Sequence, residues 1–158
     1  MASQRSGPLR AFRIADGRHP IFDGTGAAVH GGRWNSPGRR IIYGAETFSG
    51  ALLEILAHTN IGRIPKNQVY IEIHVPDGVE IEELCVDELP GWDSADLEAS
   101  RAYGDAWYDQ RRTAVLLVPS VVTRIERNVL INQEHPDFAR LRVTEPARVA
   151  WDARLLGT

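Results

Sequence analysis

Three side chains that could take part in chemistry lie close together in this sequence: Arg33, Tyr43 and Glu54. Arg33 follows two glycines, Tyr43 ends a short apolar run, and Glu54 interrupts a hydrophobic segment. A guanidinium binds phosphate through two parallel hydrogen bonds, an aromatic face supports a cation, and a carboxylate stabilises a developing positive charge. Such a set suits chemistry on a phosphorylated sugar that carries a cationic leaving group.

Arg33 is a candidate anion-binding residue. Gly31 and Gly32 have no side chains that would keep a ligand away from the backbone. A hydrogen bond to a charged group contributes about 1.5–3 kcal/mol, so that one well-placed arginine can hold a pyrophosphate. The alternative is a structural arginine that pairs with a carboxylate or stacks on Trp34.

Tyr43 and Glu54 each have a structural alternative as well. Tyr43 precedes Gly44, where a strand should end, so its ring could stack on a ligand or be a core tyrosine with a satisfied hydroxyl. At about 100° per residue, Glu54 falls on the same side of a helix as Ala51 and His58, opposite the apolar face. That side is small and weakly polar, so Glu54 is either a carboxylate that lines a cleft or an exposed glutamate.

Other familiar patterns are weak in this chain. Ser120, His135 and Asp137 could form a triad, but no nucleophile-elbow pattern surrounds the serine. The glycines within 24–29 begin like a dinucleotide-binding fingerprint, but its last position is valine and no convincing strand precedes it. The five histidines are scattered and Cys85 is the only cysteine, so we expect no metal site and no internal disulfide.

Composition restricts the class of protein. The 158 residues suit one domain, and 43% hydrophobic with 25% charged residues is typical of a globular chain. A net charge of −3 argues against direct binding of nucleic acid, which needs a basic surface. No apolar run approaches the roughly 20 residues of a membrane span, and the first residues lack the apolar core of a secretory signal. We therefore expect a cytoplasmic protein.

Hydrophobic periodicity and turn residues predict a mixed β-sheet with a few flanking helices, a compact α+β domain over residues 9–158. Residues 1–8 are expected to be a flexible tail, and Asp16–Gly32 a long loop. Helices are predicted at Thr47–His58, capped by Thr47, and at 95–108, capped by Asp93 or Ser94. Strands are predicted at Leu9–Ala15, Ile41–Tyr43, Val69–Val75, Val79–Leu84, Ala114–Val118, Val129–Ile131 and Val149–Trp151.

One stretch of the chain is strongly acidic. Asp77 through Glu98 contains nine acidic residues and neither lysine nor arginine. It is either a solvated face or a docking surface for a basic partner.

The short motifs of this chain resemble the RES domain family in their order and spacing, from about Leu9 to Trp151. The family is named for an Arg, a Glu and a Ser, which here are Arg33, Glu54 and Ser120. The motifs are Gly31-Gly-Arg-Trp-Asn35, Ile41-Ile-Tyr43, Ala51-Leu-Leu-Glu54, Val118-Pro-Ser120, Asn128-Val-Leu-Ile-Asn132 and His135-Pro-Asp137.

This resemblance implies a fold similar to that of the ADP-ribosyltransferases and a role as the toxin of a bacterial type II toxin–antitoxin pair. RES proteins consume NAD+, and some are phosphorylases that place inorganic phosphate on the ADP-ribose. NAD+ would then be a substrate, inorganic phosphate the co-substrate, and no prosthetic group would be needed. The implied catalytic residues are Arg33, Tyr43, Glu54 and Ser120, and the implied NAD+-binding residues are Arg33, Trp34, Asn35 and Tyr43.

The resemblance also implies a partner, an Xre-type helix-turn-helix antitoxin that covers the active-site cleft, with a possible homodimer inside a larger complex. Alternatives stay open at this point: an ADP-ribosyltransferase that modifies a protein, an NAD+ glycohydrolase, or a binding module whose acidic stretch is the functional surface. The sequence assigns no role to His30, Asn128, Asn132 or His135.

Overall fold

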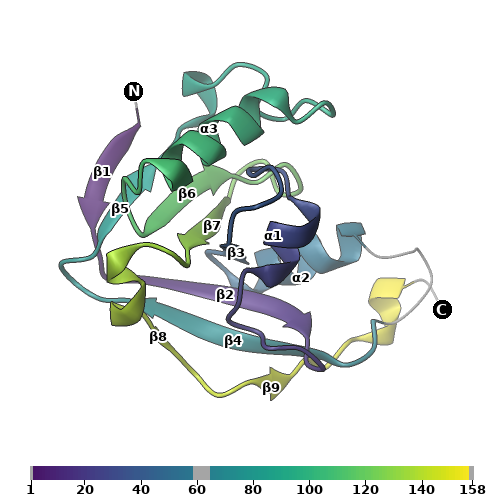
Figure 1. Ribbon diagram of the computed structural model, residues 1–158. Coiled ribbons are helices and arrows are strands. Elements are labelled where there is room, and N and C mark those ends of the chain that lie inside the picture. Colours follow the sequence, from purple (N-terminus) through teal and green to yellow (C-terminus); the bar gives the residue numbers. More distant parts are fainter. Residues whose placement is uncertain (1, 59–64, 157–158) are drawn as a thin grey trace.

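The computed structural model describes residues 2–58 and 65–156 of the chain, which form an α+β domain around one mixed sheet (Figure 1). The strand order is β1-β5-β6-β7-β3-β2-β4-β8, with β9 paired to β4. Neighbouring strands are antiparallel except for β5 and β6. The strands are β1 (Ser3–Ser6), β2 (Leu9–Asp16), β3 (Ile41–Ala45), β4 (Gln68–Val75), β5 (Glu80–Glu83), β6 (Val115–Pro119), β7 (Arg127–Asn132), β8 (Arg142–Val143) and β9 (Ala147–Arg148).

Three α-helices of the described residues pack against this sheet (Figure 1). They are α1 (Thr25–His30), α2 (Phe48–His58) and α3 (Glu98–Asp109), with single 3-10 turns at Val86–Glu88, Pro136–Arg140 and Ala153–Leu156. Helix α3 covers β6 and β7 through Trp107, which packs on Leu116 and Leu130. Helix α2 packs on β2 and β3 through Ala51. No helix in the described ranges is long and apolar enough to cross a bilayer.

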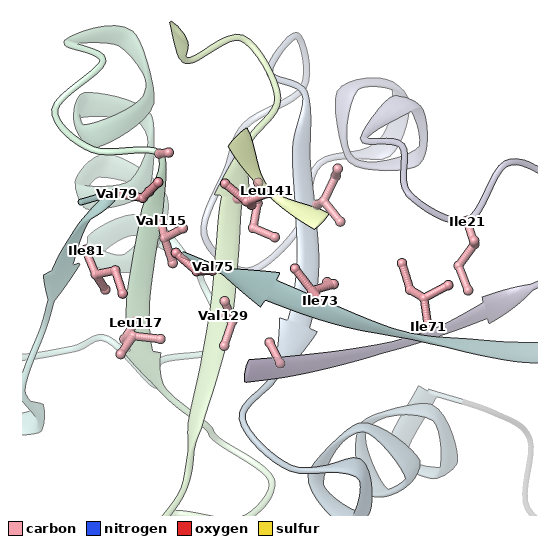
Figure 2. Packing of buried hydrophobic residues seen from close by; sticks show 14 residues of the cluster. Ile21, Ile71, Ile73, Val75, Val79, Ile81, Val115, Leu117, Val129 and Leu141 are labelled. Atoms are coloured by element: carbon pink, nitrogen blue, oxygen red, sulfur yellow. The ribbon is translucent and has the colours of Figure 1, made fainter. Parts of the chain in front are cut away.

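The largest hydrophobic cluster lies between two halves of the bent sheet (Figure 2). Ile71 and Ile73 of β4 pack in one cluster with Val115 of β6 and Val129 of β7. The intervening residues of β6 and β7 belong to a second cluster under α3. Because successive side chains of a strand point to opposite faces, both faces of β6 are buried, as its uninterrupted apolar run predicts.

The predicted strands from Leu9 through Ile131 are present, with ends shifted by a few residues. The expectation of a loose tail is wrong for residues 3–6, which form β1 and pair with β5. Their backbone groups make this pairing, and all four side chains are exposed, so hydrophobic periodicity gives no signal. The predicted strand at Val149–Trp151 is also wrong, since pairing with β4 ends at Arg148.

The long loop expected at Asp16–Gly32 contains a helix, α1. At six residues it is too short to show helical periodicity, and the residue before it is bonded to a side chain that is distant in the sequence. The amide of Gly24 donates to Gln133 Oε1 at 2.7 Å, and the amide of Gly31 closes the helix on the carbonyl of Ala27 at 2.8 Å.

One helix cap is confirmed and one is wrong. Thr47 Oγ1 accepts the amide of Gly50 at 2.9 Å, as expected for the start of α2. Helix α3 begins at Glu98, and the residue before it, Leu97, has φ 63° and makes no side-chain cap. Asp93 and Ser94 lie too far before this start to cap the helix, and the carboxylate of Asp93 pairs with Arg124 of another loop.

The acidic stretch is not a uniform solvated face. Glu82 is 3% exposed and forms an ion pair with Arg112 at 2.9 Å. Glu83 pairs with Arg127 at 3.0 Å. These two carboxylates therefore serve contacts within the domain, and that of Asp93 pairs with Arg124 at the surface.

Candidate active site

Arg33, Tyr43 and Glu54 line one cavity of about 670 Å³. That volume is in the range of small-molecule and cofactor sites. The cavity lies between α1, α2, the start of α3 and the strands β2, β3 and β7. Its lining residues also include Arg13, Asp23, Gly31, Gly32, Trp34, Ala51, Ile55, His58, Leu97, Arg101, Val121, Val122 and Asn128.

Glu54 projects from the side of α2 that faces this cavity, together with Ala51, Ile55 and His58. Its Oε1 accepts two hydrogen bonds, from Ser120 Oγ at 3.0 Å and from Asn128 Nδ2 at 2.8 Å. Both donors meet the same oxygen, so among the described contacts Oε2 is left for a ligand. The side chain is half-buried and oriented, which matches the cleft-lining interpretation and not the exposed glutamate.

The donors to Glu54 come from the adjoining ends of two strands. Ser120 follows β6 and is 1% exposed, and its Oγ also accepts the amide of Thr123 at 3.1 Å. Asn128 stands on β7 opposite Val118 of β6, and it lines the cavity. Ser120 is not among the lining residues, so the structure brings it to the ligand only through Glu54.

Tyr43 lines the cavity and is at the same time a tyrosine whose hydroxyl is satisfied inside the protein. Its hydroxyl donates to Asn35 Oδ1 at 2.7 Å and accepts the amide of Trp34 at 3.0 Å. Burial raises the pKa of the Tyr43 hydroxyl well above its usual value, so the group stays neutral. A Cβ at Gly32 would lie 2.6 Å from this hydroxyl, so the loop approaches the ring only because residue 32 is glycine. The residue lines the cavity while its hydroxyl is satisfied inside the protein.

Arg33 lines the cavity and also fixes a neighbouring loop. Its Nη1 donates to the carbonyls of Ser94 at 3.2 Å and Trp92 at 3.4 Å. Ser100 Oγ of α3 in turn donates to the carbonyl of Arg33 at 2.6 Å. Arg33 makes no ion pair with a carboxylate of the described residues. Trp34 stacks on Trp92, with ring centroids 6.5 Å apart. The structural alternatives of an ion-paired or tryptophan-stacked arginine are therefore not what holds it.

The two residues after Arg33 are buried. Trp34 is 1% exposed and reaches the cavity wall. Asn35 is fully buried and does not line the cavity, in contrast to its expected place at the dinucleotide. Asn35 Nδ2 donates to the carbonyls of Ala27 and Ser36, each at 3.0 Å. The side chain thus holds the loop that presents Arg33.

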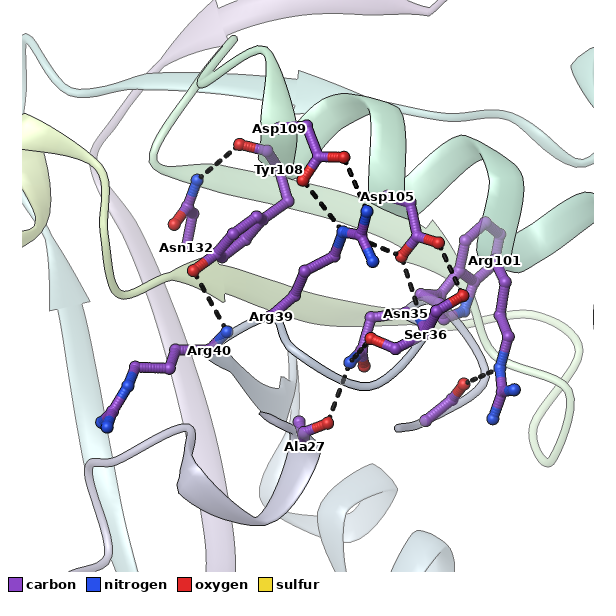
Figure 3. A network of polar contacts seen from close by, with 12 residues as sticks. Ala27, Asn35, Ser36, Arg39, Arg40, Arg101, Asp105, Tyr108, Asp109 and Asn132 are labelled. Carbon is purple, nitrogen blue, oxygen red and sulfur yellow. Dashed lines mark hydrogen bonds and ion pairs between the residues drawn. The ribbon is translucent and has the colours of Figure 1, made fainter. Parts of the chain in front are cut away.

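A polar network ties this same loop to α3 (Figure 3). The amide and the hydroxyl of Ser36 donate to the two oxygens of Asp105, at 2.8 and 2.7 Å. Arg39 donates to both oxygens of Asp109, at 2.9 and 2.7 Å. The Arg39 guanidinium lowers the pKa of the Asp109 carboxyl, so this pair stays charged at neutral pH. The position of Arg33 therefore depends on α3.

No pattern in the sequence indicates that two further arginines, Arg13 and Arg101, line the cavity. Arg13 is one of two arginines in β2, yet its guanidinium is buried and donates to the carbonyls of Ile21 at 2.6 Å and Tyr43 at 2.8 Å. Burial lowers its pKa, which the charge of Asp23 opposes. Arg101 lies on α3, and its Nε donates to the carbonyl of Gly32 at 2.9 Å. Only tertiary structure places them in the cavity.

The conceivable triad does not form. His135 Nδ1 accepts the amide of Asp137 at 3.0 Å and caps a 3-10 turn, whereas Ser120 bonds to Glu54. Asn132 is fully buried, and its amide donates to the carbonyl of Tyr108 at 3.3 Å, a structural contact. Among the four residues without an assigned role, only Asn128 lines the cavity.

A family model described as the RES domain matches residues 10–152, nearly all of the chain. The chain belongs to the RES domain family. A "Prs ADP-ribosylating toxin" of Sphingobium sp. (strain YBL2) is 39% identical over 139 residues, covering 85% of this chain and 86% of the relative. A "Toxin Res" of Yersinia enterocolitica serotype O:8 is 33% identical over 152 residues, covering 93% and 99%. With relatives named as toxins over most of its length, the chain is a toxin of this family.

The fold has a solved counterpart. The structure of the M. tuberculosis MbcT–MbcA toxin–antitoxin complex contains a chain that superposes with a TM-score of 0.74. The match covers 97% of this chain and 89% of the other at 18% identity, so it shows the shared α+β fold and nothing finer.

Proposed function

We propose that this RES-family toxin cleaves the nicotinamide–ribose bond of NAD+ and transfers the ADP-ribose to inorganic phosphate. The products are nicotinamide and ADP-ribose phosphate. The observation that carries this proposal is the Glu54 carboxylate, held by two donors on one oxygen, in the same cavity as Arg33.

The chemistry follows from where charge develops. When the bond between the ribose carbon and the nicotinamide nitrogen breaks, its electron pair leaves with nicotinamide, which becomes neutral, and the ribose becomes cationic. An oriented carboxylate, that of Glu54, stabilises this state more than the ground state. The cavity-lining ring of Tyr43 adds support for a cation. A phosphate oxygen then forms the new bond to the ribose carbon.

The remaining site residues position these groups. Ser120 and Asn128 orient Glu54, and Arg33 holds the diphosphate of NAD+ or the incoming phosphate. Trp34 forms part of the wall against which the dinucleotide lies. Asn35 acts through Tyr43 and the loop, with no contact of its own to NAD+.

The test is a nucleotide assay on protein freed of any antitoxin. We expect release of nicotinamide from NAD+, a product that contains phosphate, and a rate that rises with phosphate concentration. Glu54→Gln should lose activity by about 10²–10³, typical for removal of one electrostatic stabiliser. Glu80→Gln is the matched control, because Glu80 is exposed on β5, away from the cavity. Unchanged turnover in Glu54→Gln would reject this site.

A second function is favoured by one comparison. The Sphingobium relative is named as an ADP-ribosylating toxin of Prs. In that case a protein side chain takes the ADP-ribose in place of phosphate. Labelled NAD+ incubated with cell lysate separates the two, since transfer gives a labelled protein band and phosphorolysis labels only small molecules. Equal rates and products with and without phosphate, and no labelled protein, would indicate a glycohydrolase.

We also propose that an antitoxin of the Xre helix-turn-helix type covers the cavity, within a complex that could contain a toxin homodimer. The solved counterpart is a toxin–antitoxin complex, which supports such a partner. Co-expression should yield a stable complex that consumes no NAD+. Release of the partner should restore NAD+ loss.

A further inference from the structure

The cavity is lined by three arginines and, among the described residues, by two carboxylates, Asp23 and Glu54, so its lining carries net positive charge. Most arginines of the described residues form ion pairs on the surface, as Arg39 does with Asp109. The three that line the cavity, Arg13, Arg33 and Arg101, form none. Their side-chain hydrogen bonds go to backbone carbonyls. Unpaired guanidinium groups around a partly buried cavity indicate a site for an anion.

Arg101 has the most specific placement of the three. Two successive residues of α3 bind two successive carbonyls of the loop: Ser100 Oγ that of Arg33 at 2.6 Å, and Arg101 Nε that of Gly32 at 2.9 Å. A Cβ at Gly31, which has φ 72°, would lie 3.0 Å from Arg101 Nη2. The guanidinium therefore lies against a bare stretch of backbone at the cavity wall.

The carboxylate that could have neutralised Arg101 is engaged elsewhere. Asp105 lies one helical turn further along α3, where an ion pair with Arg101 is sterically possible. Instead, Asp105 accepts two hydrogen bonds from Ser36 and lies 3.4 Å from Arg39. With Nε committed to Gly32, the two terminal nitrogens of Arg101 have no described partner and are free to bind a ligand.

We infer that Arg101 binds the diphosphate of the dinucleotide together with Arg33. This inference rests on the proposed function, which supplies the dinucleotide. The Arg101 guanidinium lies against the glycine pair at 31–32, Arg33 follows that pair in the chain, and both residues line the cavity. A diphosphate carries two negative charges and an array of acceptor oxygens that suits two guanidinium groups. The Glu54 carboxylate repels the negatively charged diphosphate. The part of the cavity next to Glu54 is therefore occupied by the ribose and not by the diphosphate.

Arg101 could instead serve only to hold the carbonyl of Gly32, and variants separate the two roles. Arg101→Gln removes the charge, and Arg101→Lys keeps the charge without the forked donors. The matched control is Arg142→Gln, because Arg142 likewise donates only to backbone carbonyls, of Ala139 and Leu141, but lies outside the cavity.

The first readout is calorimetric binding of ADP, which has the diphosphate, and of adenosine, which lacks it. Loss of a hydrogen-bonded charge contact predicts that Arg101→Gln weakens ADP binding at least about tenfold. Arg101→Lys should fall between Arg101→Gln and the wild type, and Arg142→Gln should not differ from the wild type. Adenosine affinity should be the same in all four proteins, or immeasurably weak in all four. Equal weakening of ADP and adenosine by Arg101→Gln, or no weakening of ADP, would overturn the inference.

The second readout is NAD+ cleavage. Because Arg101 is remote from the bond that breaks, Arg101→Gln should raise KM about tenfold or more and leave kcat within a few fold. NAD+ cleavage by Arg101→Gln with unchanged KM and ADP affinity would reject the inference and keep the proposed function. ADP binding that depends on Arg101 in a protein that does not cleave NAD+ would reject the proposed function and keep the diphosphate site.

Discussion

The hydroxyl of Tyr43 donates to Asn35 Oδ1 at 2.7 Å, which joins strand β3 to the loop that carries Arg33. The same hydroxyl accepts the amide of Trp34. A side chain at the wall of the proposed NAD+ site thus also fixes the two residues that directly follow Arg33, the residue that is proposed to bind phosphate. Stability and ligand binding are coupled at this residue.

The first prediction separates the hydroxyl of Tyr43 from its ring. Tyr43→Phe leaves the buried Asn35 Oδ1 and the Trp34 amide without a partner, which should reduce the free energy of unfolding by about 1–3 kcal/mol. The ring remains, so the folded variant should keep most of its NAD+ turnover. Denaturant unfolding checks the first point and the nucleotide assay the second. An unchanged unfolding midpoint would show that the hydroxyl is not structural.

The second prediction concerns Asn128. Asn128→Asp puts a carboxylate where an amide now donates to Glu54 at 2.8 Å. Two carboxylates at this distance repel each other and raise the pKa of one, so activity at neutral pH should fall about 10²–10³. Asn128→Ala removes the donor without adding charge and should lose less. The new carboxyl can donate to Glu54 only when it is protonated, so the activity of Asn128→Asp should recover as the pH falls, and identical pH profiles for both variants would argue against this contact.

The third prediction is a double-mutant cycle on Ser120 and Glu54. If Ser120 acts only by orienting Glu54, then Ser120→Ala should slow NAD+ cleavage in the wild type but have no further effect in Glu54→Gln. The measured quantity is kcat/KM for all four proteins. Additive losses would mean that Ser120 has a role of its own in the reaction.

The fourth prediction concerns the contact between α3 and the Arg33 loop. A Cβ at Gly104 would lie 1.8 Å from the carbonyl oxygen of Trp34. Gly104→Ala should therefore push the helix away from the loop and lower the melting temperature by several degrees, since overpacking costs about 1–3 kcal/mol. Gly26→Ala is the matched control, because a Cβ in that helix has open space. An unaffected Gly104→Ala variant would contradict the close approach.

Much of the fold could be predicted from the sequence because most strands carry an alternating or continuous apolar pattern. β6 is the clearest case, since a run of apolar residues ending in proline became a strand buried on both faces. β1 could not be predicted because its four side chains are exposed, so it has no hydrophobic pattern, and it is held by backbone pairing and by the ion pair of Arg5 with Glu83. The start of α3 could not be predicted because the residue before the helix, Leu97, is not a capping residue by type, whereas Asp93 and Ser94 are.

The site was predictable where its residues come from one short segment of the chain. Arg33, Tyr43 and Glu54 were selected by their immediate surroundings, and the structure brings them to one cavity. Arg101 and Asn128 come from distant elements and have ordinary neighbours in the sequence. Asn35 shows the converse problem, because the resemblance to the family implied a contact with NAD+, whereas the side chain is fully buried and does not line the cavity.

On β3, Ile42 belongs to the central hydrophobic cluster, whereas its neighbours Ile41 and Tyr43 line the cavity. On β7, Val129 likewise belongs to the cluster and its neighbour Asn128 lines the cavity. None of the buried residues of the cluster lines the cavity. A substitution at the wall therefore leaves the residues of the largest cluster in place, although Trp34 and Ile41 also pack in the second cluster, under α3. An insertion or deletion of one residue in these strands would instead move the cavity-lining side chains to the interior face and the interior side chains to the cavity. Sequences of this family should therefore differ by substitutions in these strands and by changes of length only in the loops.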